Sequence, residues 1–521
     1  MSATAKPNLI IIVFDAARAE NFSTYGYAKA TTPNLTRWAE RMSVYDQCIS
    51  AATWTLPSTA GLFTGTHEST HGLVLDGDRL RPDFTTMAEM LKGMGYFTAK
   101  VTGEVPYVSG FSGLDRGFMH NYEPPPSAAR RLLRSLKRRK AQKQGVQRRE
   151  GVDLGLDIRT EAALAAKGGL KNRLRYWGTG LTDCGASACF AHVRQLWQEK
   201  SGQPKFVYMH LQETHAEYRP PHRYRTRFMD DRLKRRNFAA INQRPNPHDA
   251  GLVKMTAEEY EILTGLYDGC IAYLDEQTGR FLDDLSRSSE FDNTMVVVTA
   301  DHGDCLGRHG VLGHQFVCYD ALVHIPWFIK WPKAIAAGAW GAGGAIKPGH
   351  TGQLVQNIDL LPTVCDVTGA MKPEQCEGRS MLSDAGRDTA ISENLKPFGV
   401  SAIKQGLHTL KPDLNRAVLS VRSRTHKLVA YSNHAPEELY DLTSDPKESR
   451  NLLAEKNGAN VDQGELARLR GVLEGWKPKW QAAAARINEQ VFRDAANPAG
   501  ALNADIDPEI AERLRSLGYL D

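Results

Sequence analysis

The segment Asn8–Phe14, NLIIIVF, is an almost unbroken run of apolar residues that ends directly at Asp15. Two later segments have the same form: FVYMHL at 206–211, and TMVVVTA at 294–300, which ends at Asp301. Apolar runs without polar alternation are typical of strands that are buried on both faces of a parallel sheet. The sequence therefore predicts a central sheet with polar residues at the carboxyl ends of its strands.

Helical patterns separate these runs, over 85–94 and 257–285. Strands that alternate with helices predict an α/β fold with a doubly wound, mostly parallel central sheet. Ligands of such sheets bind beyond the carboxyl ends of the strands, so we expect Asp15 and Asp301 to face one crevice.

The character of the chain changes near residue 400. Segments 417–422 and 426–431 have the pattern of antiparallel strands, and the chain from 462 onward is polar and helical. We expect a catalytic α/β domain over 1–400 and a smaller C-terminal α+β subdomain over 401–521.

A strongly basic stretch interrupts the first domain. Residues 130–149 carry many Lys and Arg, no acidic residue, and leucines at helical spacing. We expect a basic helical insertion at about 124–180. Two interpretations stay open: a solvated basic helix, or contact with an anionic polymer or membrane surface.

Composition excludes several classes of protein. The 521 residues are 41% hydrophobic and 24% charged, with a net charge of +5, which is too balanced to indicate nucleic-acid binding by itself. The longest apolar runs are far shorter than the ~18 residues of a membrane-spanning helix. The first seven residues lack the pattern of a secretory signal, and the eight cysteines have no paired spacing. We therefore expect a cytoplasmic protein without a transmembrane segment.

The ends of two predicted strands indicate a metal site. Buried carboxylates such as Asp15 and Asp301 are costly unless they are paired or bind a cation, and His302 adds an imidazole nitrogen. For either carboxylate alone, capping of a neighbouring helix would be the simpler interpretation. Carboxylate and imidazole together favour a divalent Mn, Zn or Mg ion over Ca, which prefers oxygen ligands only.

A second polar element is ATWTLPSTAGLFTG at 52–65. Pro57 suits the first turn of a helix, with Thr55 or Leu56 as the cap. Thr55 would then lie at a helix N-terminus, where backbone N–H groups favour an anion. A capping threonine without a catalytic role is the structural alternative.

These segments together resemble the sulfatase family of the alkaline phosphatase superfamily. The similar segments follow one another in the family's order over nearly the whole chain: IIIVFDAAR (10–18), TLPSTAGLFTG (55–65), HLQETHAEYRPP (210–221), YDGCIAYLDEQTGRFLDDL (267–285), TADHGDCLGRHG (299–310), IPWFIKWP (325–332), NIDLLPTV (357–364), ELYDLTSDPKESRNLL (438–453) and RLRSLGYL (513–520). The resemblance implies that Asp15, Asp301 and His302 bind the metal and that Thr55 faces the substrate.

Three positions differ from the usual family pattern. Thr55 stands where sulfatases have the cysteine that is oxidised to formylglycine, Thr59 where they have an arginine, and Ala16 where they have a second aspartate. Threonine cannot give formylglycine, and in relatives within the superfamily it is the nucleophile that attacks phosphate esters. The resemblance then implies Thr55 as a catalytic nucleophile.

Three histidines complete the predicted site. His215 is a candidate for protonating the leaving group or holding a non-bridging oxygen. His309 and His314 are candidates for binding the remaining anionic oxygens of the substrate. A hydrogen-bonded structural histidine is the alternative for each.

The leading hypothesis is a metal-dependent phosphodiesterase or phosphatase that acts on a small-molecule or glycan ester. A sulfuric ester hydrolase acting on a sulfated glycan or small ester is the second hypothesis. A phosphoryl-group transferase and a non-catalytic binding protein are further alternatives. The sequence leaves the organic part of the substrate and the oligomeric state open.

Overall fold

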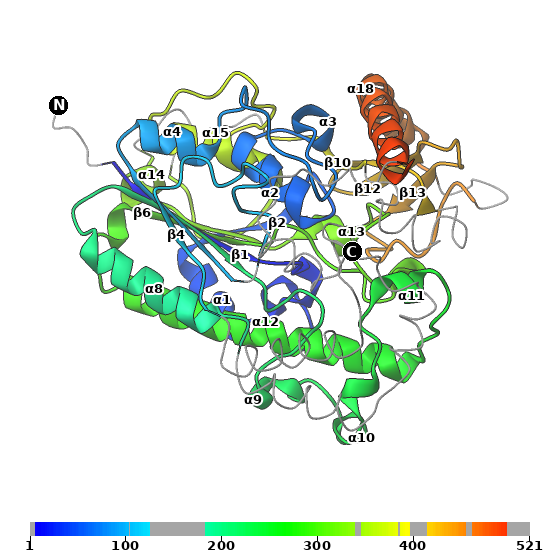
Figure 1. Ribbon diagram of the computed structural model, residues 1–521, viewed down its shortest axis with the longest axis horizontal. Helices are drawn as coiled ribbons and strands as arrows, with labels where there is room; N and C mark the ends of the chain where they lie inside the picture. The colour runs from blue at the N-terminus through cyan, green and yellow to red at the C-terminus, as the bar shows by residue number, and fades with distance from the viewer. Residues whose placement is uncertain are drawn as a thin grey trace.

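A computed structural model describes residues 6–103, 105–125, 183–338, 345–383, 386–395, 414–454 and 461–496. These residues form a nine-stranded mixed sheet and a separate four-stranded sheet (Figure 1). The predicted basic insertion lies outside the described residues except at its first two positions, and so does the segment at 513–520.

The large sheet is mostly parallel, which confirms the predicted fold class. Its parallel part has the order β4 (His120–Tyr122), β3 (Phe97–Thr102), β5 (Lys205–Leu211), β1 (Asn8–Phe14) and β6 (Thr294–Thr299). The sheet continues with β8 (Trp327–Lys330), β2 (Ser43–Ile49) and β7 (His324–Ile325), which pair antiparallel, and with β9 (Gly349–Gln356), which is parallel to β2.

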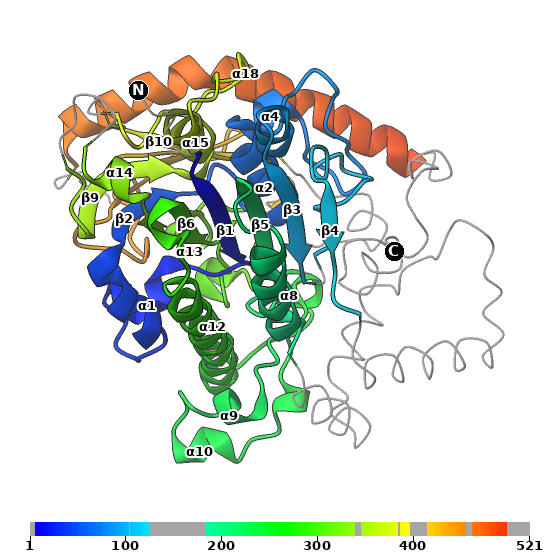
Figure 2. The ribbon, with the colours of Figure 1, turned by 90° about the vertical axis from the view of Figure 1, so that its left-hand side faces the viewer.

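Helices cover both faces of this sheet, as Figures 1 and 2 show. One face carries α2 (Thr55–Thr64), α4 (Met87–Gly93) and α15 (Leu360–Thr368), and the other carries α1 (Pro33–Trp38), α8 (Ala186–Glu199) and α12 (Ala257–Leu285). Short helices connect these elements: α3 (Glu68–His71), α9 (His222–Arg225), α10 (Asp231–Lys234), α11 (Pro245–Asp249), α13 (Asp320–Val323) and α14 (Lys333–Ala336).

Strand β1 lies between β5 and β6, and all seven of its residues are buried. Ile11 pairs in register with Tyr208 on β5 and with Val297 on β6. Because the three strands are parallel, their carboxyl ends meet at one edge of the sheet. The residues that follow them are thereby brought together.

The smaller sheet is antiparallel, with the order β10 (Ala390–Asn394), β11 (Val418–Arg422), β12 (His426–Tyr431) and β13 (Glu438–Asp441). The long helix α18 (Gln463–Ala496) packs on it, and Leu469, Leu473 and Trp480 of this helix are buried. Strand β10 precedes residue 401, and the domain boundary at that position stays a prediction. Within the described part of the chain, no helix is both long and apolar enough to span a membrane.

Candidate active site

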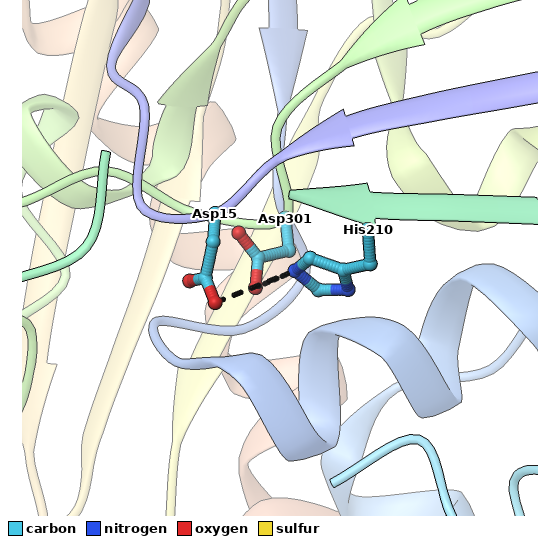
Figure 3. A group of neighbouring side chains, drawn as sticks. All are labelled: Asp15, His210 and Asp301. Carbon is cyan, nitrogen blue, oxygen red and sulfur yellow. Dashed lines mark ion pairs between the residues drawn. The ribbon is translucent and has the colours of Figure 1, made fainter. Parts of the chain in front are cut away.

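Two carboxylates meet at the shared edge of β1 and β6. The backbone N–H groups of Ala16 and His302 donate to Asp301 Oδ1 at 3.0 and 2.9 Å. The Ser58 hydroxyl, from helix α2, donates to the Asp301 carbonyl at 2.6 Å. Asp301 is therefore held in place through Oδ1 and its main chain, and Oδ2 is left to face Asp15 and His210 (Figure 3).

His210, near the end of β5, completes a three-residue group that could hold a metal ion. Its Nε2 atom lies 3.5 Å from Asp15 Oδ2 and 3.6 Å from Asp301 Oδ2 (Figure 3). Sequence reasoning did not single out this residue. The available signal was a histidine within the apolar run FVYMHL, but only the register that places His210 beside Val13 of β1 brings it to the carboxylates.

His302 lies on another side of the same group. Its Nε2 atom is 3.4 Å from Asp301 Oδ2, 3.8 Å from Asp15 Oδ1 and 3.2 Å from Thr55 Oγ1. Its Nδ1 atom is 2.7 Å from the carbonyl oxygen of Gly303. Since a carbonyl can only accept, Nδ1 carries a proton, and in the neutral ring the lone pair is on Nε2.

Thr55 is the first residue of α2, and all ten residues of this helix are buried. The N-cap is Trp54, which has an extended backbone, so the prediction that Thr55 or Leu56 caps the helix was wrong. The Thr55 side chain instead contacts His302. The hydroxyl thus lies at a helix N-terminus, where backbone N–H groups favour an anion.

The arrangement of these atoms fits a divalent cation. Asp15 Oδ1, His210 Nε2 and Asp301 Oδ2 are buried, and none has a hydrogen-bond partner among the residues that the structure describes. Separations of 3.4 to 3.6 Å between the nitrogens and carboxylate oxygens are too long for good hydrogen bonds. Ligand atoms about 2.1 Å from a shared tetrahedral ion would lie about 3.4 Å apart. The group therefore has the spacing and the unsatisfied atoms of a metal site.

The histidines compensate the buried carboxylates electrostatically. Burial raises the pKa of Asp15, but His215, His210 and His302 outweigh it and hold that pKa well below its usual range. Burial lowers the pKa of His210, but Asp15 and Asp301 outweigh it and raise that pKa. The carboxylate cluster thus favours positive charge, as a cation site should.

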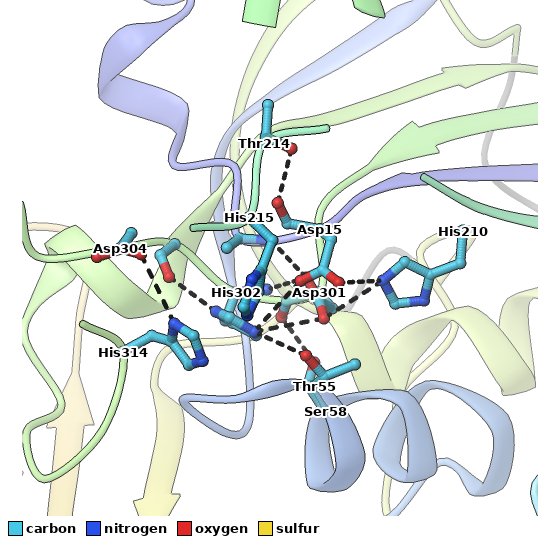
Figure 4. Close-up of polar contacts among 12 residues, drawn as sticks. Asp15, Thr55, Ser58, His210, Thr214, His215, Asp301, His302, Asp304 and His314 are labelled. Atoms are coloured by element: carbon cyan, nitrogen blue, oxygen red, sulfur yellow. Dashed lines mark hydrogen bonds and ion pairs between the residues drawn. The ribbon is translucent and has the colours of Figure 1, made fainter. Parts of the chain in front are cut away.

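Two of the predicted substrate-side histidines lie close to His302 (Figure 4). The ring centroid of His314 is 4.6 Å from that of His302 and 5.0 Å from that of His215. Burial, with the charge of His302, lowers the pKa of His314 to about 4. Its Nδ1 atom lies 3.6 Å from Asp304, which accepts a hydrogen bond from Tyr218 at 2.7 Å. Sequence reasoning missed Asp304, although it directly follows Asp301-His302-Gly303 in the chain.

His309 lies in a different environment. Its half-buried ring stacks on Tyr319, with 3.7 Å between the ring centroids. Burial, with the neighbouring charges of Arg308 and Lys427, lowers its pKa to about 4. These contacts do not join His309 to the other histidines, and its role as an anion ligand stays a prediction.

Comparison with known proteins agrees with this geometry. The family model described as sulfatase matches residues 7–370, which is well over half of the chain. The chain belongs to the sulfatase family. A second model, described as N-sulphoglucosamine sulphohydrolase, C-terminal, matches residues 307–472. This sulfatase-family chain is therefore a hydrolase, and the family's dependence on metal agrees with the carboxylate and histidine cluster.

Relatives of this sulfatase-family chain match over most of its length. The arylsulfatase of Clostridium perfringens is 23% identical, over 86% of this chain and 90% of the relative. The N-acetylglucosamine-6-O-sulfatase of Bacteroides thetaiotaomicron is 23% identical, over 89% of this chain and 86% of the relative.

Solved structures show the same fold. The phosphonate monoester hydrolase of Agrobacterium radiobacter has a TM-score of 0.64 at 19% identity, covering 89% of this chain and 96% of its own. A protein in complex with its substrate D-glucosamine-2-N,6-O-disulfate has a TM-score of 0.63 at 19% identity, covering 92% of this chain and 98% of its own.

Proposed function

We propose that the protein is a metal-dependent hydrolase that cleaves phosphate esters, with Thr55 as the nucleophile. The observation that carries this proposal is the position of Thr55 Oγ1, 3.2 Å from His302 Nε2 at the edge of the Asp15, His210 and Asp301 group. An unmodified hydroxyl at the N-terminus of a buried helix suits attack on an anionic ester.

Asp15, Asp301, His210 and His302 would hold the divalent metal. A bound metal supplies charge that offsets the substrate's oxygens and lowers the pKa of an adjacent hydroxyl. Because two imidazoles accompany the carboxylates, Mn, Zn or Mg suits this site better than Ca.

In the proposed reaction the Thr55 hydroxyl loses its proton to solvent, its oxygen attacks phosphorus, and the bond from phosphorus to the leaving oxygen breaks. His215 donates a proton to that leaving oxygen. His215 Nδ1 lies 2.6 Å from the carbonyl oxygen of Ala216, and this contact orients the ring. Water then hydrolyses the phosphothreonine and regenerates the hydroxyl.

The side chain of Thr55 favours phosphate over sulfate. The methyl group on its β-carbon prevents oxidation to the formylglycine aldehyde, if Thr55 holds the position of the family's cysteine. Attack on a sulfate ester would leave a threonine sulfate, without the second hydroxyl by which a hydrated aldehyde expels sulfate. Turnover on sulfate esters should therefore stall.

A sulfuric ester hydrolase is the second candidate, favoured by the names of the relatives, which include an arylsulfatase and an N-acetylglucosamine-6-O-sulfatase. These names also support a glycan ester as one class of substrate, beside small-molecule esters. A cytoplasmic location is part of our proposal, supported by eight cysteines that are all free thiols.

A panel of 4-nitrophenyl esters tests the proposal, because all members share one leaving group. The panel contains a phosphate monoester, a phosphate diester, a phosphonate ester and a sulfate ester, each assayed with Mn, Zn, Mg and Ca. We expect kcat/KM for the best phosphorus ester to exceed that for sulfate by at least ~100-fold, roughly 2.7 kcal/mol in transition-state binding.

Two variants connect this activity to the proposed nucleophile. Thr55→Ala should lose most of it, and Thr55→Ser should keep a measurable part because a hydroxyl remains. Faster turnover of the sulfate ester that depends on Thr55 would instead establish the second candidate.

A further inference from the structure

Tyr208 lies beside His210 on strand β5. The two residues are separated by one position, so their side chains lie on the same face of the sheet. The Tyr208 hydroxyl is 2.9 Å from His210 Nδ1, and both side chains are buried. The ring of Tyr208 packs edge-on against Phe63 of helix α2, with 4.7 Å between the centroids. The phenol is therefore held firmly against the imidazole.

This contact differs from those of the other site histidines. His302 Nδ1 faces the Gly303 carbonyl and His215 Nδ1 faces the Ala216 carbonyl. A carbonyl only accepts, so Nδ1 of each of these rings carries a proton, and in the neutral ring the lone pair lies on Nε2. A hydroxyl can accept or donate, so Tyr208 is compatible with either tautomer of His210.

The surroundings of His210 Nε2 decide which direction of the hydrogen bond between Tyr208 and His210 suits a metal ion. If Tyr208 donates to Nδ1, the proton of the neutral ring is on Nε2, between Asp15 and Asp301. If Tyr208 accepts from Nδ1, the Nε2 lone pair faces the same space as Asp15 Oδ2 and Asp301 Oδ2, which lie 3.5 and 3.6 Å away. Only the second arrangement offers a nitrogen ligand beside the two carboxylates.

An acceptor for the phenol's own proton is at hand. The Thr59 side chain, from helix α2, lies next to the phenol. Thr59 Oγ1 is buried, and a hydroxyl oxygen can accept a hydrogen bond as well as donate one.

We propose that Tyr208 is a positioning residue that holds His210 in the tautomer whose Nε2 atom binds the metal. The inference rests on the metal dependence in the proposed function. It also explains how the site obtains a fourth protein ligand although position 16 is an alanine, whose contribution to Asp301 is a backbone N–H. Partners of this kind, which orient a metal-binding histidine, typically change metal affinity 10- to 100-fold when they are removed.

Metal affinity of the full chain tests this inference without an activity assay. Zn²⁺ and Mn²⁺ are each titrated in competition with a chromophoric chelator. We expect Tyr208→Phe to weaken binding by about 10- to 100-fold. Tyr96→Phe is the matched control, because this mostly buried tyrosine donates to the Pro7 carbonyl at 3.0 Å, at the opposite end of β1 from Asp15. The control should bind metal as the wild type does.

A double-mutant cycle separates positioning from general damage to the fold. His210→Ala should weaken binding, and adding Tyr208→Phe to it should cause no further loss, because Tyr208 acts through His210. The absorption spectrum of bound Co²⁺ should change in the same way for Tyr208→Phe and His210→Ala. If Tyr208→Phe does not fold, Thr59→Val, which removes the proton acceptor, should shift affinity in the same direction.

Three results distinguish the possible errors. Equal affinity of Tyr208→Phe and the wild type, or losses that simply add in the double variant, would overturn the positioning role alone. A wild-type chain that binds neither metal would overturn this inference and the metal dependence of the proposed function together.

Discussion

Replacing Asp301 by asparagine should remove most of the response of the protein to metal while leaving its fold intact. The amide oxygen of Asp301→Asn can still accept the N–H groups of Ala16 and His302, which now bind Oδ1. The amide nitrogen takes the place of Oδ2, and it has neither charge nor a lone pair to offer a cation. The substitution therefore removes one metal ligand with little change in shape.

The size of the effect follows from linkage. A metal at 100 times its Kd stabilises the folded wild type by about 2.7 kcal/mol, and an affinity loss of about 100-fold reduces this to about 0.4 kcal/mol. For a chain of 521 residues, with an unfolding entropy of about 2 cal/mol/K per residue, this corresponds to Tm shifts of about 2.5 °C and less than 0.5 °C. Without metal, Asp301→Asn should be more stable than the wild type, because the substitution relieves the repulsion between two buried carboxylates.

Thermal unfolding with excess chelator and with added Zn²⁺ or Mn²⁺ measures both effects. Asp268→Asn is the control, since this buried carboxylate accepts from Asn21 at 2.7 Å and pairs with Lys29. That variant should lose stability but keep the metal response. An unchanged metal response of Asp301→Asn, or a metal-free form clearly less stable than the wild type, would refute the assignment of Asp301 as a ligand.

Three further predictions concern modification, pH and packing. Peptide mapping of the purified protein should show Thr55 as plain or phosphorylated threonine, and an aldehyde at a nearby residue such as Ser58 would contradict the proposed nucleophile. Burial lowers the pKa of His71 to about 3, so below pH 6.5 the unfolded chain binds a proton that the folded chain does not. From pH 7 to 5 this residue should reduce stability by about 2 kcal/mol, and denaturant titrations should show a weaker pH dependence for His71→Asn; an equal dependence would contradict the assignment. A Cβ atom at Gly303 would lie 2.1 Å from the Ala321 carbonyl oxygen, whereas one at Gly77 would meet no atom within 4 Å. Gly303→Ala should therefore lower the free energy of unfolding by on the order of 3 kcal/mol, and equal midpoints for Gly303→Ala and Gly77→Ala would show that the backbone moves aside.

Part of the site could be predicted from short stretches of the sequence. Asp15 and Asp301 directly follow runs of apolar residues, and parallel strands bring their carboxyl ends to one edge whatever their order in the sheet. Thr55 was located by Pro57, whose ring suits the first helical turn, although the cap proved to be Trp54. Such inferences succeed because hydrophobic burial and backbone preferences act over a few neighbouring residues.

The sequence by itself determined the α/β fold class, the carboxylates at the strand ends and the helix that carries Thr55. Only the tertiary structure decided that His210 faces both carboxylates, because this depends on β5 pairing with β1 in one register. His309 and His314 are only five residues apart in the chain, but the structure places them in different surroundings. His314 packs against His302, whereas His309 stacks on Tyr319. The physical reason is that which atoms meet depends on strand order, register and loop path, and these are set by packing between segments far apart in the chain.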